Sequence, residues 1–156
     1  QWEAAAEPAR AAGIRVAHLR IGIVLSPEGG ALAQMLTPFR LGLGGVVGSG
    51  DQYMSWITLD DVVGAFLHCI ETPSLEGPVN GVGPNPATNR AFTKTLGTAL
   101  GRPTVFPVPA LAVKAAFGEM GEALLLPSVR CVPRRLEESG YTFQDPELLP
   151  ALKAML

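Results

Sequence analysis

The chain has 156 residues, 47% of them hydrophobic, and a formal net charge of −2, so it can bury a core of its own and offers no basic stripe to nucleic acid. Its two cysteines, Cys69 and Cys131, lack the spacing of a metal site or a disulfide framework, and no apolar run reaches the roughly 20 residues of a membrane span. These features predict a soluble, cytoplasmic protein without metal, nucleic-acid or membrane partners.

The N-terminal segment has the pattern of a helix followed by a strand. Residues 2–6 (WEAAA) resemble a helix interior without a preceding cap, so we expect the chain to be part of a longer one. Pro8 is expected to kink this helix and Gly13 to end it. Residues 14–21 (IRVAHLRI) are an almost continuous apolar run, which is typical of a strand in a parallel sheet. A second helix is expected over residues 31–41, bent or ended early at Thr37-Pro38.

The most informative stretch is LGLGGVVGSGDQYMSWITLDD, residues 41–61. Its glycines permit sharp turns and close approach of the backbone to another surface. Val46-Val47 and residues 52–59 are rich in β-formers on either side of the Gly50-Asp51 turn, which predicts a small hairpin. An ordinary connector is the alternative. Asp60 or Asp61 is expected to cap the next helix, so Asp61→Asn should cost little stability.

Helices and strands continue to alternate after residue 61. Val62, Val63, Phe66, Cys69 and Ile70 are expected to form one apolar stripe of a helix, with Cys69 in the core rather than reactive. Residues 77–82 (GPVNGV) predict a strand. A further helix is expected to begin at a Thr88 cap and to end at Gly101. This rhythm is that of a doubly wound α/β fold.

Frequent prolines mark a change of texture after residue 102. We expect residues 1–102 to form part of a Rossmann-like α/β domain and residues 103–156 to form a small, mainly helical subdomain. Short helices are predicted over residues 109–117, 119–126, 133–139 and 146–156. Gly140 should end the third, and Tyr141 and Phe143 are placed to dock the tail against the core.

Several catalytic patterns are missing from the sequence. No Gly-rich fingerprint follows a strand, so the phosphate-binding turn of a dinucleotide fold is not found. Neither tyrosine has a lysine four residues later. His18 and His68 are each interpreted as core imidazoles. No residue of this chain is therefore assigned a catalytic role.

Five segments together resemble a known family. They are WEAAA, LRIGIVLSPEGGAL, TPFRLGLGGVVGSGDQYMSWITLDD, GPVNGVGPNPATNRAFTKTLGTALGRP and VPRRLEESGYTFQDPELLPAL. The chain resembles the C-terminal half of the epimerase-like extended short-chain dehydrogenase/reductases, which are NAD-dependent epimerase/dehydratase family proteins with a C-terminal domain of unknown function, 1731. The resemblance implies NADP as cofactor, with the dinucleotide fingerprint and the catalytic Tyr and Lys in a half that would precede Gln1.

The resemblance also places Arg20 at the end of the strand that lies beside the nicotinamide, where ligands of open α/β sheets bind. A guanidinium there requires a charged partner, either a carboxylate of this protein or a phosphate of the cofactor. We favour contact with the cofactor.

Substrate contacts are expected from the segment around residue 54. Relatives that act on nucleotide sugars usually carry an Arg shortly before the Asp pair, and Met54 stands at the matching position here, which puts a sugar-nucleotide substrate in doubt. Arg40 could reach the site from the preceding helix. Gln52, Ser55 and Trp56 could instead present hydrogen bonds and an aromatic wall to a smaller, less charged substrate, although Trp56 is equally compatible with the core.

Two functions follow from these features. The first is the substrate-side portion of an NADP(H)-dependent oxidoreductase or epimerase acting on a small molecule. The alternative is a non-catalytic, cofactor-binding regulatory or interaction protein on a degenerate dehydrogenase fold. In either case the strand over residues 14–21 is expected to have an unpaired edge, through which the chain could form a homo-oligomer.

Overall fold

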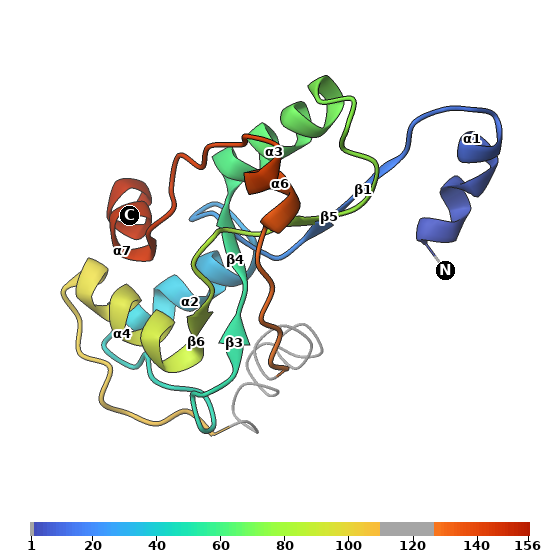
Figure 1. The fold of residues 1–156 in the computed structure, drawn as a ribbon. Helices are drawn as coiled ribbons and strands as arrows, with labels where there is room; N and C mark the ends of the chain where they lie inside the picture. Colours follow the sequence, from blue (N-terminus) through green and yellow to red (C-terminus); the bar gives the residue numbers. More distant parts are fainter. Residues whose placement is uncertain (1, 110–126) are drawn as a thin grey trace.

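The computed structural model describes residues 2–109 and 127–156 and shows a mixed arrangement of helices and strands (Figure 1). The helices predicted over residues 109–117 and 119–126 fall on the segment 110–126, which lies outside the described residues. The described helices are η1 (Glu3–Ala6), α1 (Glu7–Ala11), α2 (Gly30–Arg40), α3 (Leu59–Glu71), α4 (Asn89–Leu100), α6 (Arg134–Glu138) and α7 (Leu148–Met155). The described strands are β1 (Ala17–Ile21), β2 (Ile23–Leu25), β3 (Tyr53–Met54), β4 (Trp56–Thr58), β5 (Gly77–Gly81) and β6 (Ala87–Thr88).

The strands pair two by two. β1 pairs in parallel with β5, β2 pairs in parallel with β4, and β3 pairs antiparallel with β6. The predicted parallel strand is thus confirmed, in the shorter form of β1, and so is the strand over GPVNGV as β5. β1 is half exposed, because among the described residues only β5 pairs with it.

Gly22 lies where the chain changes its hydrogen-bonding partner. The Gly22 N–H donates to the Gly81 carbonyl at 3.1 Å, whereas the next amide, that of Ile23, donates to the Ser55 carbonyl at 2.8 Å. A Cβ atom at Gly22 would lie 2.3 Å from the Ser55 carbonyl oxygen, closer than side chains tolerate. Glycine is therefore required for β1 and β2 to run past both neighbours at this point.

The hairpin predicted over residues 46–59 is wrong. Val47 forms a bridge with Val108, and β3 and β4 pair with the distant strands β6 and β2. The local turn does form, since the Gly50 N–H donates to the Val47 carbonyl at 3.0 Å. After this turn, residues 52–59 pack between strands that are far apart in the sequence. The apolar surface buried there stabilises the fold more than pairing within a local hairpin would.

The helix α3 begins at a different cap from the one predicted. Thr58 is the N-cap, and its hydroxyl accepts a hydrogen bond from the Asp61 N–H. Asp60 is exposed, while Asp61 lies in the first turn with its carboxylate buried. At the other end, the Arg15 guanidinium donates to the carbonyls of Cys69 and Ile70 in the last turn of the helix and to that of Leu75 beyond it.

The apolar residues of α3 lie on two faces rather than in one stripe. Val62 and Cys69 are buried, which confirms Cys69 as a core residue, whereas Val63, Phe66 and Ile70 are exposed. The predicted stripe combined residues from both faces, because Val63, Phe66 and Ile70, spaced three and four apart, form a second face beside the buried one.

The C-terminal segment packs into two hydrophobic clusters. Helix α7 contributes Ala151 and Leu152 to the larger cluster, beside α2 and α4, and α6 contributes Leu136 to the smaller one around β5. Tyr141 and Phe143 pack against the smaller cluster, as predicted. The division of the chain after residue 102 stays a prediction.

Other local predictions have mixed outcomes. The Thr88 cap is confirmed, and Gly13, Gly101 and Gly140 adopt the left-handed conformations expected after helices. Pro38 does not end α2, which runs on to Arg40, because proline removes only its own N–H donor and the chain beyond it still bonds back, as the Leu41 N–H does to the Thr37 carbonyl at 3.2 Å. Among the described residues no helix is long and apolar enough to cross a bilayer.

Candidate functional site

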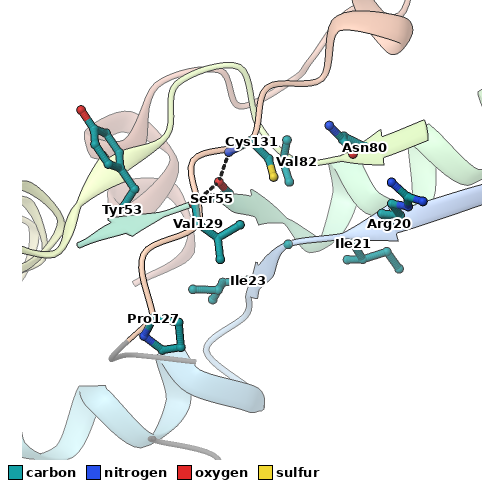
Figure 2. Close-up of a pocket in the computed structure, with 11 residues that line it drawn as sticks. Arg20, Ile21, Ile23, Tyr53, Ser55, Asn80, Val82, Pro127, Val129 and Cys131 are labelled. Carbon is teal, nitrogen blue, oxygen red and sulfur yellow. Dashed lines mark hydrogen bonds between the residues drawn. The ribbon is translucent and has the colours of Figure 1, made fainter. Parts of the chain in front are cut away.

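A pocket of about 370 Å³ lies where β1 ends and β2 begins (Figure 2). The carboxyl ends of the parallel pair β1 and β5 open into it, and one side is formed by the segment that follows residue 126. Five of the eleven lining residues have aliphatic side chains. The lining residues are Arg20, Ile21, Gly22, Ile23, Tyr53, Ser55, Asn80, Val82, Pro127, Val129 and Cys131.

Ser55 is buried at the base of the pocket, with 5% of its surface exposed. Its hydroxyl donates to the Val129 carbonyl at 2.8 Å and accepts from the Cys131 N–H at 2.8 Å, as the dashed lines in Figure 2 show. A hydroxyl has one proton to donate, and Ser55 uses it within the protein. The sequence prediction placed Ser55 at the substrate, and the structure places it at the pocket with its donor engaged.

Arg20 lies at the opposite end of the lining, beside Asn80, its register partner on β5. Its Nε and Nη2 atoms donate to the two carboxylate oxygens of Glu3 at 2.6 and 2.8 Å. This hydrogen bonding lowers the pKa of Glu3 and raises the pKa of Arg20. Of the two partners considered for Arg20, the structure shows a carboxylate of the protein, and the cofactor contact stays a prediction.

Three predicted site residues lie outside the pocket lining. Trp56 is fully buried in the larger cluster, and its indole N–H donates to the Asn85 carbonyl at 2.8 Å. Gln52 donates to the Val47 carbonyl at 3.0 Å. Arg40 is exposed in the last turn of α2. The structure therefore brings Arg20 and Ser55 to one pocket, and the substrate contacts predicted for the other three stay predictions.

Several lining residues carried no functional signal in the sequence. Asn80 and Val82 follow from the rule that ligands meet the carboxyl ends of parallel strands, once β5 is known to lie beside β1. Pro127, Val129 and Cys131 had no such signal, because nothing local indicates that their segment packs beside β3 and β4. The described residues contain no group of three His, Cys, Asp or Glu side chains that could hold a metal ion.

Comparison with known proteins shows which family the chain resembles. Residues 108–155 match the family model described as a domain of unknown function, DUF1731. An epimerase family protein of Mycobacterium bovis is 48% identical over 151 residues, covering 97% of this chain and 50% of the relative. Human epimerase family protein SDR39U1 is 44% identical over 158 residues, covering 100% of this chain and 53% of the relative. The chain thus spans about half the length of the curated relatives it matches.

Solved structures agree with these matches. Human SDR39U1 (isoform 2), crystallised with NADPH, superposes with a TM-score of 0.84 at 44% identity, covering 91% of this chain and 48% of the human one. The resemblance to the epimerase-like extended short-chain dehydrogenase/reductases is confirmed. A nucleoside-diphosphate sugar epimerase of Corynebacterium glutamicum has a TM-score of 0.77 at 34% identity, covering 99% of this chain and 29% of that one. The fold is therefore the α/β, Rossmann-type fold of these epimerases, with helices in its C-terminal region.

Proposed function

We propose that this chain is the substrate-side portion of an NADP(H)-dependent oxidoreductase or epimerase of the extended short-chain dehydrogenase/reductase type. The observation that carries the proposal is the pocket at Gly22, where the carboxyl ends of β1 and β5 meet beside β4. Ligands of α/β sheets bind at the carboxyl ends of the strands. The NADPH-bound structure of human SDR39U1, which is similar over nearly the whole chain, supports the same cofactor.

The described residues fit one end of such a cofactor. Ile21, Gly22 and Ile23 offer an aliphatic surface and a backbone without a side chain, which suits the flat face of a nicotinamide. When bound, the nicotinamide supplies or accepts the hydride at a carbinol or carbonyl carbon. No comparable cradle for its phosphates is formed here, because Arg20 is paired with Glu3. In this proposal the fingerprint and the catalytic Tyr and Lys come from residues outside the chain.

The substrate is a small molecule, and a nucleotide sugar fits poorly. Met54, which stands where sugar-nucleotide enzymes usually carry an Arg, is only 1% exposed and packs in the larger cluster. A buried thioether cannot neutralise a diphosphate. The neighbouring residue Tyr53 lines the pocket instead. The centroid of its ring lies 5.3 Å from the guanidinium carbon of Arg130.

NADPH titration by calorimetry tests the cofactor assignment. The 156-residue chain should bind weakly or not at all, because its described part lacks a phosphate cradle, while the longer gene product should bind. In this proposal Arg20 exchanges Glu3 for a cofactor phosphate in the longer protein, so Arg20→Met should lower the affinity about tenfold or more, the loss expected for a hydrogen bond to a charged group. Arg10→Met is the matched control, since Arg10 forms a similar exposed pair with Glu7. Micromolar binding by the short chain, or equal affinity of the two variants, would contradict the proposal.

A non-catalytic, cofactor-binding regulatory protein on the same fold is the second candidate. Its basis is that one fold can serve proteins with and without turnover. Reading the gene upstream of the codon for Gln1 separates the two candidates. An intact Tyr-x-x-x-Lys sequence there supports the enzyme, and its replacement supports the regulator.

We further propose that β1 contributes its second edge to another strand, either of the same protein or of a second copy. Among the described residues it pairs on one side only, and such edges recruit further strands. The 156-residue chain should therefore self-associate in sedimentation experiments, and a clean monomer at high concentration would contradict this.

The two cysteines have no disulfide partner, which supports a reducing cytoplasm.

A further inference from the structure

Residues 127–132, here called the wall segment, form one side of the pocket and lie within the stretch that matches the domain of unknown function. The wall segment runs beside β3 and β4 and is tied to them along its length. The Val129 N–H donates to the Tyr53 carbonyl at 3.2 Å, and the Tyr53 N–H donates to the Ser128 hydroxyl at 3.1 Å. Farther on, the Asn80 amide donates to the Val132 carbonyl at 3.1 Å.

Ser55 is the central attachment of this segment. It is the only lining residue whose side chain both donates to and accepts from the wall segment in the described structure, through Val129 and Cys131. Because these bonds fix the backbone on either side of residue 130, they set where the Val129 side chain and the Cys131 thiol stand in the pocket (Figure 2). Ser55 thus acts on a ligand through the wall, as a positioning residue.

The two ends of the pocket differ in polarity. Arg20 and Asn80 lie at one end, whereas Ile23, Pro127 and Val129 lie at the other (Figure 2). At the second end the Ser55 hydroxyl is already hydrogen-bonded, and the hydroxyl of Tyr53, which also lines the pocket, points away from Ile23 and Val129 (Figure 2). A charged or hydroxyl-rich group entering there would lose its water without finding a donor, whereas an aliphatic or aromatic group would bury apolar surface.

We propose that the wall segment determines substrate selection, by presenting an aliphatic surface, held in place by Ser55, to an uncharged apolar group of the substrate. This rests on the proposed function only in taking the pocket as the substrate site. It assigns a role to part of the domain of unknown function, and it assigns a chemical class to one end of the ligand.

Cys131 allows a test that needs no cofactor. Its thiol lines the pocket and is partly exposed, whereas Cys69 is buried and burial raises its pKa, so Cys69 serves as an internal unreactive control. The probes are benzyl methanethiosulfonate, which is uncharged and apolar, and 2-sulfonatoethyl methanethiosulfonate, which is anionic. In each reaction the Cys131 thiolate attacks the sulfenyl sulfur and displaces methanesulfinate. Rates are divided by those with glutathione, and mass spectrometry of the peptides identifies the modified cysteine.

The apolar reagent should react at Cys131 with a normalised rate at least about fivefold above that of the anionic one, because the end of the pocket nearest the wall accepts apolar surface. In Ser55→Ala both rates should rise and the ratio should fall toward one. Ser55→Thr keeps a hydroxyl and should restore the ratio. Equal rates in the unmodified protein, or an unchanged ratio in Ser55→Ala with an intact melting transition, would overturn the proposal.

Val129→Ser gives a second route if Ser55→Ala fails to fold. Val129 is 53% exposed and holds Ser55 through its backbone carbonyl, so this variant keeps both hydrogen bonds of the hydroxyl. A polar wall should lower the ratio of the two reagents, and an unchanged ratio would overturn the proposal. Because no NADPH is present, failure here is distinguishable from failure of the cofactor assignment, which titration measures separately.

Discussion

The C-terminal segment is fastened to the earlier part of the chain at two places of opposite character. At Asp61 a buried carboxylate, 1% exposed, accepts from the Tyr141 hydroxyl and from the backbone N–H groups of Gln144 and Asp145. At Ser55 a neutral hydroxyl exchanges two bonds with the wall segment beside an open pocket. The Asp61 carboxylate, which is surrounded by donors and shielded from solvent, stabilises the fold. The Ser55 hydroxyl, which lies beside a cavity, positions the wall segment.

The difference shows why similar-looking hydrogen bonds call for different interpretations. Asp61 has its acceptor sites filled by the protein, so its carboxylate has none to offer the neighbouring cavity of about 270 Å³, which Thr58, Asp60 and Asp145 help to line. The Ser55 hydroxyl also has its hydrogen bonds made within the protein, but the wall segment that it holds faces the pocket. The two attachments should therefore respond differently to substitution, in size and in what changes.

The largest effect is expected at Asp61. Asp61→Asn should lower the free energy of unfolding by about 2–4 kcal/mol, because the new amide group faces a backbone N–H and a charged acceptor is lost. The expectation from sequence, that this variant costs little, rested on a capping role that belongs to Thr58. Urea denaturation measures the change. Asp60→Asn is the control, since Asp60 is exposed on the same turn and should change stability by less than about 0.5 kcal/mol. Similar losses in both variants would remove the distinction drawn for Asp61.

The next effect is expected at Gly22, on the pocket side. Gly22→Ala should cost about 1–3 kcal/mol, because its methyl group would lie 2.3 Å from the Ser55 carbonyl oxygen and push the junction of β1 and β2 away from Ser55. Gly29→Ala is the matched control, as a Cβ there meets nothing within 4 Å and its φ of −168° suits any residue. Thermal melts of the two variants make the comparison. Equal melting temperatures would mean that β1 can move away from Ser55 freely.

Ser55→Ala should cost less, about 1 kcal/mol, because it removes neutral hydrogen bonds beside a partly open pocket. The same denaturation experiment that measures Asp61→Asn measures this variant. Its effect on thiol reactivity at Cys131 should exceed what the stability loss explains. A destabilisation as large as that of Asp61→Asn would make Ser55 a structural anchor of the same kind.

A separate effect, on the pH dependence of stability, concerns Tyr141. Burial, the charge of Asp61 and the hydrogen bond to it raise the pKa of Tyr141 above its ordinary value of 10.0. The folded state therefore keeps the phenolic proton at a pH where the unfolded chain loses it, so this contribution to stability is complete below about pH 10 and falls as the pH rises further. Tyr141→Phe should flatten the decline of the melting temperature above about pH 10. An identical decline in both proteins would contradict the prediction.

The sequence by itself determined the elements whose signals are local. The Thr88 cap and the glycines that follow helices are set by neighbouring residues and are found where predicted, and the strand predicted over residues 77–82 forms as Gly77–Gly81. The family resemblance came from the same source, since it depends on residues in order along the chain.

Tertiary structure alone decided which distant residues meet. Arg20 pairs with Glu3 across 17 positions, Ser55 holds Val129 across 74, and Asp61 receives Gln144 across 83. Residues 52–59 had the composition of a hairpin, yet they pair with β2 and β6. Propensity and spacing describe what a segment can form, whereas its partner is chosen by the apolar surface it buries and the polar groups it satisfies, and these belong to segments that the local sequence does not contain.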